Sequence, residues 1–305
     1  MRLSWGVRTD RGRVRSLNED AVLASPPVFV VADGMGGHAA GEVASGLVVE
    51  AFKQLAADAA SPEAGLDAED VVALLDRVNG EILDYGEATP AARGLGTTVA
   101  GLALVANGGR TELLAFNIGD SRLYQVDGDQ LRQVSVDHSA VQELLDGGAI
   151  DADQVALHPQ RHVVTRALGS DPGPRPDLWF LAPTAGDRFV LCSDGLTGEV
   201  DQAGLSDAVL GEADPAVLAH RLVEMALQHG GRDNVSVVVV DVVDAGTGED
   251  AERTVPRASV TDDVATTQPR AEIGEDPADP PPPAPEALPL AAPSGVAEDV
   301  GEGMR

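Results

Sequence analysis

The chain has 305 residues and a formal net charge of −29 at pH 7, from 50 acidic and 21 basic residues. So negative a chain argues against a nucleic-acid-binding protein, because Lys and Arg must displace the counterions of a phosphate backbone. The hydrophobic fraction of 43% is ample for a folded core, and the single cysteine, Cys192, excludes an intramolecular disulfide. No apolar run reaches the ~18 residues of a membrane span, and residues 1–6 lack a signal-peptide pattern. We therefore expect a cytoplasmic protein.

Strand-like and helix-like patterns fill the first 244 residues. Turns at 107–109 and 127–128 are too short for the crossover that parallel strands require, so the strands they join are expected to be antiparallel. Strands that are apolar on both faces must be covered on both sides. The expected fold is therefore α+β, with two antiparallel sheets in a sandwich flanked by helices. In chain order, we expect a strand at 28–32, helices at 41–58 and 68–85, strands at 97–106, 113–118, 122–126 and 188–192, a helix at 215–229 and a strand at 235–243.

The composition changes sharply after residue 245. Residues 246–305 contain no Phe, Trp or Tyr, hold half of the 20 prolines, and carry 13 acidic against 4 basic residues, a net charge of −9. Too little apolar surface is available there to offset the entropy of ordering. We expect a folded domain at 1–244 and a disordered, acidic, Pro-rich tail at 245–305. Its proline run at 280–283 could be a polyproline II ligand, or the tail could be a linker or a solubilising end.

An Asp flanks an apolar strand at four places, usually with Gly beside it. Asp33, Asp120 and Asp194 follow the strands expected at 28–32, 113–118 and 188–192. Asp233 directly precedes the strand at 235–243. If these strand ends meet at one edge, the gathered charge needs a cation to neutralise it, and carboxylate, carbonyl and water are the ligands that Mg²⁺ and Mn²⁺ prefer. Taken singly, each of these Asp residues could equally be an ordinary turn residue.

Three further segments suit phosphate chemistry. Arg11, Arg13 and Arg15 form a local basic cluster just before two acids, Glu19 and Asp20. The alternative for this cluster is a solvated surface.

A glycine-rich loop at 34–38 places His38 near Asp33, although His38 could also be an exposed loop imidazole. The stretch 94–98 precedes a strand and is expected to serve tight packing.

Six motifs in this order resemble those of metal-dependent serine/threonine phosphatases of the PPM (PP2C) type, and the chain looks like a bacterial member. The resemblance covers residues 1 to about 243 and implies a β-sandwich of two antiparallel sheets flanked by helix pairs, an α-β-β-α arrangement. The motifs are RSLNED at 15–20, VADGMGGH at 31–38, GLGTT at 94–98, NIGDSR at 117–122, LCSDGL at 191–196 and GRDN at 231–234.

The resemblance implies a core site for two Mn²⁺ or Mg²⁺ ions. Asp33 matches the ligand that bridges them, with the Gly34 carbonyl on one ion. Asp194 and Asp233 match the remaining direct ligands of the other ion. Asp120 matches a residue that, with Asp194, holds a third and weaker metal in bacterial relatives.

The remaining roles also follow from the resemblance. Glu19 and Asp20 match acids that orient waters on the metals or touch a metal. Arg15 matches the arginine that grips the substrate phosphate. His38 resembles the proposed general acid only loosely, because Met-Gly-Gly separates it from the Asp-Gly pair. Cys192, in the interior of a strand, is expected to be a core residue.

The implied reaction is hydrolysis of phosphoserine and phosphothreonine in proteins by water that the metals activate. No covalent phosphoenzyme is expected. Residues 139–165 look like the variable flap beside the site of such phosphatases, where substrate choice would lie. Phosphoproteins, including Ser/Thr kinases and their targets, are the implied partners, and we expect a monomer.

Two other functions are compatible with the fold. The chain could be a catalytically silent regulatory domain that binds phosphoproteins or another partner, but all the expected metal carboxylates are present. Two-metal chemistry could also act on nucleic acid, which the charge of −29 disfavours.

Overall fold

The computed structural model describes residues 1–36, 40–59, 65–170, 173–245 and 257–258. All of them belong to the first of two units into which the chain divides, Met1–Thr261 and Asp262–Arg305. His38 and nearly all of the expected tail therefore lie outside the described residues. Within the described ranges, no helix has the length and apolar character needed to cross a bilayer.

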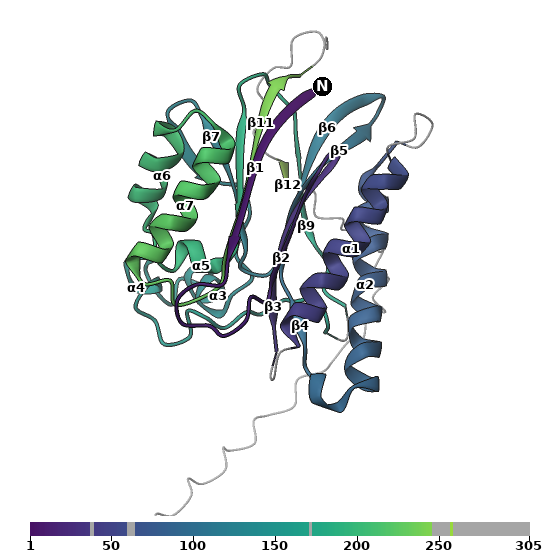
Figure 1. Ribbon diagram of the computed structural model, residues 1–305, viewed down its shortest axis with the longest axis vertical. Helices are drawn as coiled ribbons and strands as arrows, with labels where there is room; N and C mark the ends of the chain where they lie inside the picture. Colours follow the sequence, from purple (N-terminus) through teal and green to yellow (C-terminus); the bar gives the residue numbers. More distant parts are fainter. Residues whose placement is uncertain (37–39, 60–64, 171–172, 246–256, 259–305) are drawn as a thin grey trace, which may run out of the picture. The chain divides into compact units, whose positions relative to one another are not determined.

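Two antiparallel sheets form the centre of the first unit (Figure 1). The described part of one sheet has five strands, in the order β1 (Arg2–Asp10), β11 (Val235–Asp244), β10 (Arg188–Cys192), β7 (Arg122–Asp127) and β8 (Gln130–Gln133). In the other sheet the order is β12 (Arg257–Ala258), β9 (Asp177–Leu181), β6 (Arg110–Ile118), β5 (Val99–Asn107), β3 (Val28–Met35) and β2 (Asp20–Ser25), and β4 (Gly96–Thr97) pairs with β3. The short β5–β6 and β7–β8 connections join antiparallel neighbours, as predicted.

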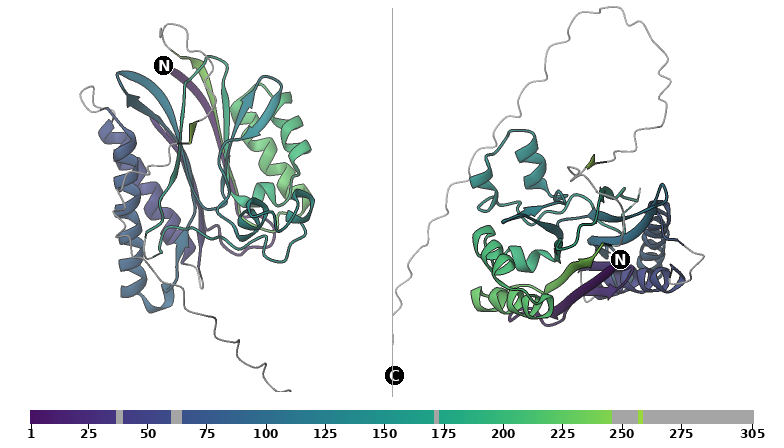
Figure 2. Two further views of the ribbon diagram at one scale, coloured as in Figure 1. Left: turned by 180° about the vertical axis from the view of Figure 1, so that it is seen from behind. Right: turned by 90° about the horizontal axis from the view of Figure 1, so that it is seen from above.

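Helix pairs cover the outer faces of the two sheets (Figure 2). One pair is α1 (Gly41–Ala59) and α2 (Ala68–Ala88), and the other is α6 (Gln202–Gly211) and α7 (Pro215–His229). The expected α-β-β-α sandwich of the α+β class is thus confirmed. Shorter helical segments are η1 (Pro90–Ala92), α3 (Ala140–Asp146), α4 (Ala152–Val155) and α5 (Asp194–Thr197). Of these, α3 and α4 lie in the segment 139–165 that the sequence suggests as a flap.

Two boundaries differ from the prediction for packing reasons. The second helix continues past Gly86 to Ala88, because Gly86 is buried inside the helix and a Cβ there would come 2.9 Å from a methyl group of Leu95. The strand expected at 97–106 is interrupted at Thr98, which pairs with the backbone of Asp33 instead of continuing the ladder.

Local sequence fixes several helix ends. The helix α2 starts with a capping box, in which Asp67 and Asp70 each accept the backbone N–H of the other. The carboxylate of Asp214 accepts two N–H groups at the start of α7, Pro215 occupies the first turn, and Gly230 ends the helix.

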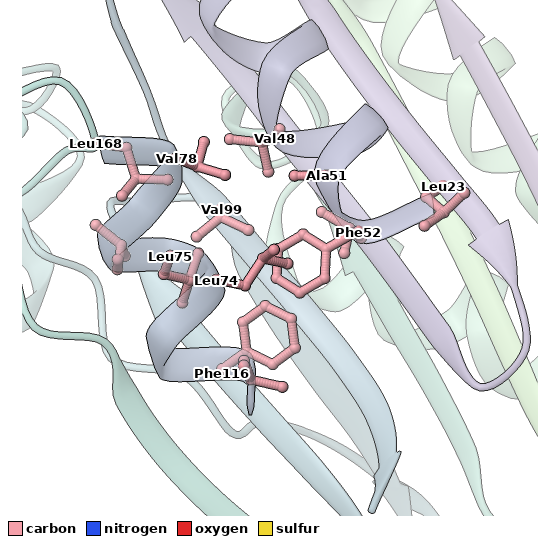
Figure 3. Packing of buried hydrophobic residues seen from close by; sticks show 14 of the residues in the cluster. Leu23, Val48, Ala51, Phe52, Leu74, Leu75, Val78, Val99, Phe116 and Leu168 are labelled. Atoms are coloured by element: carbon pink, nitrogen blue, oxygen red, sulfur yellow. The ribbon is translucent and has the colours of Figure 1, made fainter. Parts of the chain in front are cut away.

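The core under α1 and α2 is built around two stacked aromatic rings (Figure 3). Phe52 on α1 and Phe116 on β6 are both fully buried, with ring centroids 5.2 Å apart. Gly101 lies opposite Phe116 in the β5–β6 register, and a side chain there would overlap the Phe116 ring. The missing side chain in β5 therefore makes the space in which the ring lies.

Replacing Phe52 by Ala should lower the free energy of unfolding by about 3–5 kcal/mol, because it leaves a cavity beside Phe116. Urea denaturation followed by circular dichroism measures this change. The control is Val217→Ala on α7, where the side chain is 51% exposed and little change is expected. A loss below 1 kcal/mol in Phe52→Ala would contradict the packing described here.

Candidate metal centre

Asp20 and Asp33 are direct neighbours across two strands. In the antiparallel pairing of β2 with β3 the two residues stand opposite each other. Side chains of opposed residues share one face of the sheet, and like charges in such a pair are destabilising. The fold therefore holds two carboxylates together at a cost.

The surroundings of Asp20 leave one of its oxygens without a partner. Asp20 is 9% exposed, and its Oδ2 accepts a 2.8 Å hydrogen bond from the hydroxyl of Ser193. No hydrogen-bond donor within the described residues reaches Oδ1, although this atom is buried. Burial, together with the negative charges of Asp194 and Asp233, raises the pKa of Asp20 to about 7 against the hydrogen bonds from Ser236 and Ser193.

Asp33, Asp194 and Asp120 join the same cluster. Burial first, and then the charges of Asp20, Asp194, Asp120 and Asp233, raise the pKa of Asp33 well above its ordinary value. Burial and the charge of Asp233 raise the pKa of Asp194. Burial and the charges of Asp194 and Asp137 raise the pKa of Asp120 to about 7. The charges of these carboxylates therefore act on one another, although Asp33 lies inside β3, which continues to Met35.

Asp233 lies at the edge of this cluster and pairs with Arg15. The Nη2 group of Arg15 donates to Oδ2 of Asp233 at 2.7 Å, and the two side chains are 49% and 36% exposed. The other oxygen of Asp233 accepts the backbone N–H of Asn234 at 2.8 Å. A cationic side chain with a solvent-facing surface thus stands directly beside the group of carboxylates.

Asn234 fastens the loop that carries Arg15. Its Oδ1 accepts the backbone N–H of Glu19 at 2.8 Å. Its Nδ2 donates to the carbonyls of Arg11 and Leu17 at 2.8 and 2.9 Å. Asn234 belongs to the motif GRDN at 231–234, but its partners lie far away in the chain, so its role cannot be read from the sequence.

Glu19 and Gly34 bring β3 against the start of α1. The carboxylate of Glu19 accepts the N–H of Gly41 at 3.2 Å, and its carbonyl accepts the N–H of Gly34 at 3.1 Å. A Cβ on Gly34 would overlap the carbonyl of Gly41. Only glycine therefore lets the chain beside Asp33 approach the helix this closely.

The stretch 94–98 fixes the backbone of Asp33, which bears out a packing role. The carbonyl of Asp33 accepts the N–H of Thr98 and the hydroxyl of Thr97, both at 2.9 Å. The N–H of Asp33 donates to the Thr98 hydroxyl at 3.1 Å, and this hydroxyl also lies 2.7 Å from that of Ser121.

His138 is a second residue whose position the sequence does not reveal. It is 5% exposed. The ring Nδ1 of His138 accepts the backbone N–H of Gly119 at 3.0 Å, and the backbone N–H of His138 donates to the carbonyl of Gly119 at 2.9 Å. Because Nδ1 is an acceptor, Nε2 is left to donate to Asp177 at 3.2 Å. His138 therefore holds the Gly119–Asp120 turn in place.

Glu199 holds the loop before Asp233 in a similar way. Its carboxylate accepts the backbone N–H, Nε and Nη2 of Arg232 at 2.8, 2.9 and 2.8 Å. These hydrogen bonds lower the pKa of Glu199 against a smaller effect of burial. Glu199 follows α5, which starts at Asp194, so the segments that carry Asp194 and Asp233 are tied together.

Cys192 lies in the core, as expected. It is fully buried in β10, and burial raises the pKa of its thiol to about 12. A thiol in this state is a poor nucleophile.

The donor set fits hard divalent cations. Carboxylates with raised pKa values, a buried carboxylate oxygen without a partner and nearby backbone carbonyls suit ions such as Mg²⁺ and Mn²⁺, which keep part of their water shell. Within the described ranges, however, no group of three or more Asp, Glu, His or Cys side chains is placed so that it could hold a metal ion.

Replacing Asp20 by Asn should stabilise the protein in EDTA by about 1 kcal/mol, because it removes one charge of an opposed like-charge pair. A carboxyl with a higher pKa when folded makes stability fall as pH rises from about 4, its unfolded value, towards its folded value. That folded value is about 7 for Asp20, so the gain should be larger at pH 8 than at pH 5.

Urea denaturation at both pH values measures the gain. Asp76→Asn on α2 is the control, because it removes one exposed charge far from the cluster. Equal stability of the wild type and the Asp20 variant at pH 8 would show that the two carboxylates do not repel each other.

Comparisons with known proteins agree with this geometry. The protein phosphatase 2C profile matches residues 10–225. The serine/threonine protein phosphatase PstP of Mycobacterium tuberculosis is 41% identical over 273 residues, which are 84% of this chain and 51% of PstP. The chain thus spans about half the length of that relative. Serine/threonine phosphatase stp of Listeria innocua is 36% identical over 244 residues, 77% of this chain and 94% of that protein.

Solved structures show the same likeness. The crystal structure of the PstP catalytic domain in complex with two manganese ions has a TM-score of 0.71 at 40% identity and covers 79% of this chain and 99% of that one. The PPM Ser-Thr phosphatase MsPP from Mycobacterium smegmatis, solved in complex with cacodylate, gives a TM-score of 0.69 at 37% identity, with 78% and 98% covered. On the family profile, these relatives and the carboxylate cluster, the chain belongs to the protein phosphatase 2C family.

Proposed function

We propose that the protein is a Mn²⁺- or Mg²⁺-dependent phosphatase that hydrolyses phosphoserine and phosphothreonine in proteins. The observation that carries the proposal is the opposition of Asp20 and Asp33 across β2 and β3, close enough to Asp194, Asp120 and Asp233 for their charges to raise the pKa of Asp33, with the exposed cation Arg15 paired to Asp233. The relatives named as serine/threonine phosphatases support it, as does the PstP structure with two manganese ions.

In this proposal Asp33 would hold both core ions, the Gly34 carbonyl would hold one of them, and Asp194 and Asp233 would hold the other. Asp120 serves a third, weaker position together with Asp194. Bound divalent ions would lower the pKa of water and so supply the nucleophile at neutral pH.

Glu19 and Asp20 would orient water at the site. The partnerless Oδ1 of Asp20 supports this role, because it is a free acceptor in a buried place.

The chain's own residues position the phosphoryl group. Arg15 is placed to bind two phosphate oxygens, since a guanidinium has a fork of donors that matches them. Its present partner, Asp233, is a proposed metal ligand, so Arg15 and a cation neutralise the same carboxylate. When a cation takes over this neutralisation, the guanidinium is available for phosphate.

The leaving alkoxide of serine or threonine needs a proton. Our proposal keeps His38 as the candidate donor, with water at the site as the other source. No covalent phosphoenzyme is part of the proposal, because Cys192, the one thiol of the chain, is buried and not ionised at neutral pH.

The finer context is also proposed. Phosphoproteins that Ser/Thr kinases generate are the substrates, the protein acts in the cytoplasm as a monomer, and the segment 139–165 contributes to substrate choice. The acidic residues 245–305 form a tail after the catalytic domain at 1–244. Apart from Ala245 and β12, this tail lies outside the described residues, and β12 pairs with β9 at the edge of the sheet.

A silent regulatory domain is the alternative function. It is disfavoured because none of the proposed metal carboxylates is replaced by another residue type. Hydrolysis of p-nitrophenyl phosphate and of a phosphothreonine peptide with Mn²⁺, with Mg²⁺ and after EDTA separates the two functions. Release that requires the metal supports an enzyme, whereas no release from the folded protein with either metal would favour the binding domain.

The variants Asp33→Asn and Asp233→Asn should each abolish turnover of p-nitrophenyl phosphate and leave the fold intact, because each removes a charge that holds the core ions. Initial rates with Mn²⁺ and circular dichroism measure the two effects. Asp84→Asn, on the exposed side of α2, is the matched control and should keep full activity. Activity retained in either site variant would contradict the assignment of the two core ions.

Asp120→Ala should have a milder effect, because it removes a ligand of the weaker position only. We expect a severalfold rise in the Mn²⁺ concentration needed for half-maximal activity, with tight Mn²⁺ binding at the core retained in calorimetric titration. Asp129→Ala, in the exposed β7–β8 turn, is the control. Loss of the tight binding would place Asp120 in the core site instead.

A further inference from the structure

Positive charge is concentrated at one place in this acidic chain. Residues 1–17 hold five of the 21 basic residues and one acid, Asp10, while the whole chain carries −29. Three of the five, Arg11, Arg13 and Arg15, fall within five positions of each other in the loop between β1 and β2. Only Arg15 has a part in the proposed reaction.

The backbone of this loop is fixed against the metal centre. The N–H of Arg13 donates to the carbonyl of Gly231 at 2.7 Å. Asn234 holds the carbonyls of Arg11 and Leu17. A Cβ on Gly12 would overlap the carbonyl of Asp233, so the two loops are in close contact. The basic residues thus keep a constant position relative to Asp233 and Arg15.

The side chains of the loop face solvent. Arg11 and Arg13 are exposed, and Arg15 is 49% exposed. Val14 and Leu17 are 69% and 41% exposed, although their loop is well fixed. Basic and apolar side chains presented together beside a phosphate-binding residue form a surface suited to a polypeptide rather than to a small phosphate ester.

We propose that residues 11–17, here called the arginine ledge, select phosphopeptides with acidic side chains next to the phosphoresidue. The inference rests on the proposed phosphatase function and names its substrate class. With the phosphate on Arg15, neighbouring residues of the substrate pass over Arg13 and Arg11. Their carboxylates pair with the guanidinium groups, and an apolar substrate residue packs on Val14.

Stabilisation of the fold accounts for only part of the arginine ledge. The Nε of Arg13 donates to the carbonyl of Leu227 at 2.8 Å, in the last turn of α7, and so caps that helix. This bond uses one of the five N–H donors of the Arg13 guanidinium. The four N–H donors on its two Nη groups remain for a substrate. It does not account for the exposed Val14 or for Arg11, which bonds the carbonyl of Ser16 in its own loop.

The test compares two phosphothreonine peptides that differ only in having Glu or Gln at the flanking positions. For the wild type with Mn²⁺, kcat/KM should favour the Glu peptide about two- to thirtyfold, the range for two exposed ion pairs. The preference should shrink at high salt, because exposed pairs are screened. In the double variant R11Q/R13Q the ratio should fall to about one, and in Arg13→Glu the Gln peptide should become the better substrate.

The ratio of two substrates in one preparation does not depend on the fraction of active protein, so a loss of stability from the lost α7 cap would not change it. Arg110→Gln is the control. This exposed residue lies eight positions along β6 from Ile118, about 26 Å from the site end of the strand at ~3.3 Å per residue, and its ratio should equal that of the wild type.

Two different results would overturn either the specificity proposal alone or the proposed function together with it. If p-nitrophenyl phosphate is hydrolysed with Mn²⁺ but the peptide ratio is one, or is unchanged in R11Q/R13Q, the ledge is not a specificity surface while the phosphatase stands. If the folded wild type hydrolyses neither compound, the proposed function is overturned, and the ledge with it.

Discussion

The repulsion among carboxylates at one end of the sandwich is the constraint on which the rest of the site depends. Asp20 and Asp33 are opposed across β2 and β3, and Asp194 and Asp120 arrive from the ends of β10 and β6. The mutual repulsion of their charges opposes this gathering, so the packing of the two sheets and their helices must supply free energy that holds it. A divalent cation converts this cost into binding energy. The repulsion among the carboxylates thus raises the affinity of the site for the cations that the proposed reaction requires.

The residues that hold the backbone around the cluster are either uncharged or paired with a residue of opposite charge. Thr97 and Thr98 hold the backbone of Asp33, His138 holds the turn before Asp120, and Glu199 with Arg232 holds the loop before Asp233. Each of them acts on the backbone rather than on a carboxylate. Oδ1 of Asp20 is thus left for an ion or water, while the backbone that carries the cluster is held in place. Such a division of roles is what a preorganised site needs.

Much of this arrangement could be predicted, and the exceptions have physical causes. Continuous apolar runs revealed β3, β10 and β11, and the Asp residues at their ends revealed the cluster. The edge strand β1 was not predicted, because Arg2–Asp10 alternates irregularly between exposed and half-buried residues, and the short helix α6 shows no clear apolar stripe. Gly86 has the local character of a helix end but serves contact with Leu95. The roles of Asn234 and His138 depend on partners far away in the chain, which no local pattern reports.

The amide of Asn234 bonds the carbonyls of Leu17 and Arg11, which lie 217 and 223 positions before it in the chain. The strands on either side of it, β1 and β11, are likewise paired from the two ends of the domain. During synthesis on the ribosome the N-terminal loop is made first. Asn234 can bond to this loop only after the chain has been extended to β11. Because domains fold as units once their parts are available, a nascent chain that stops short of β11 has the acidic residues of β2 and β3 but no complete site. The order of translation thus makes the carboxylate cluster one of the last parts of the domain to be completed.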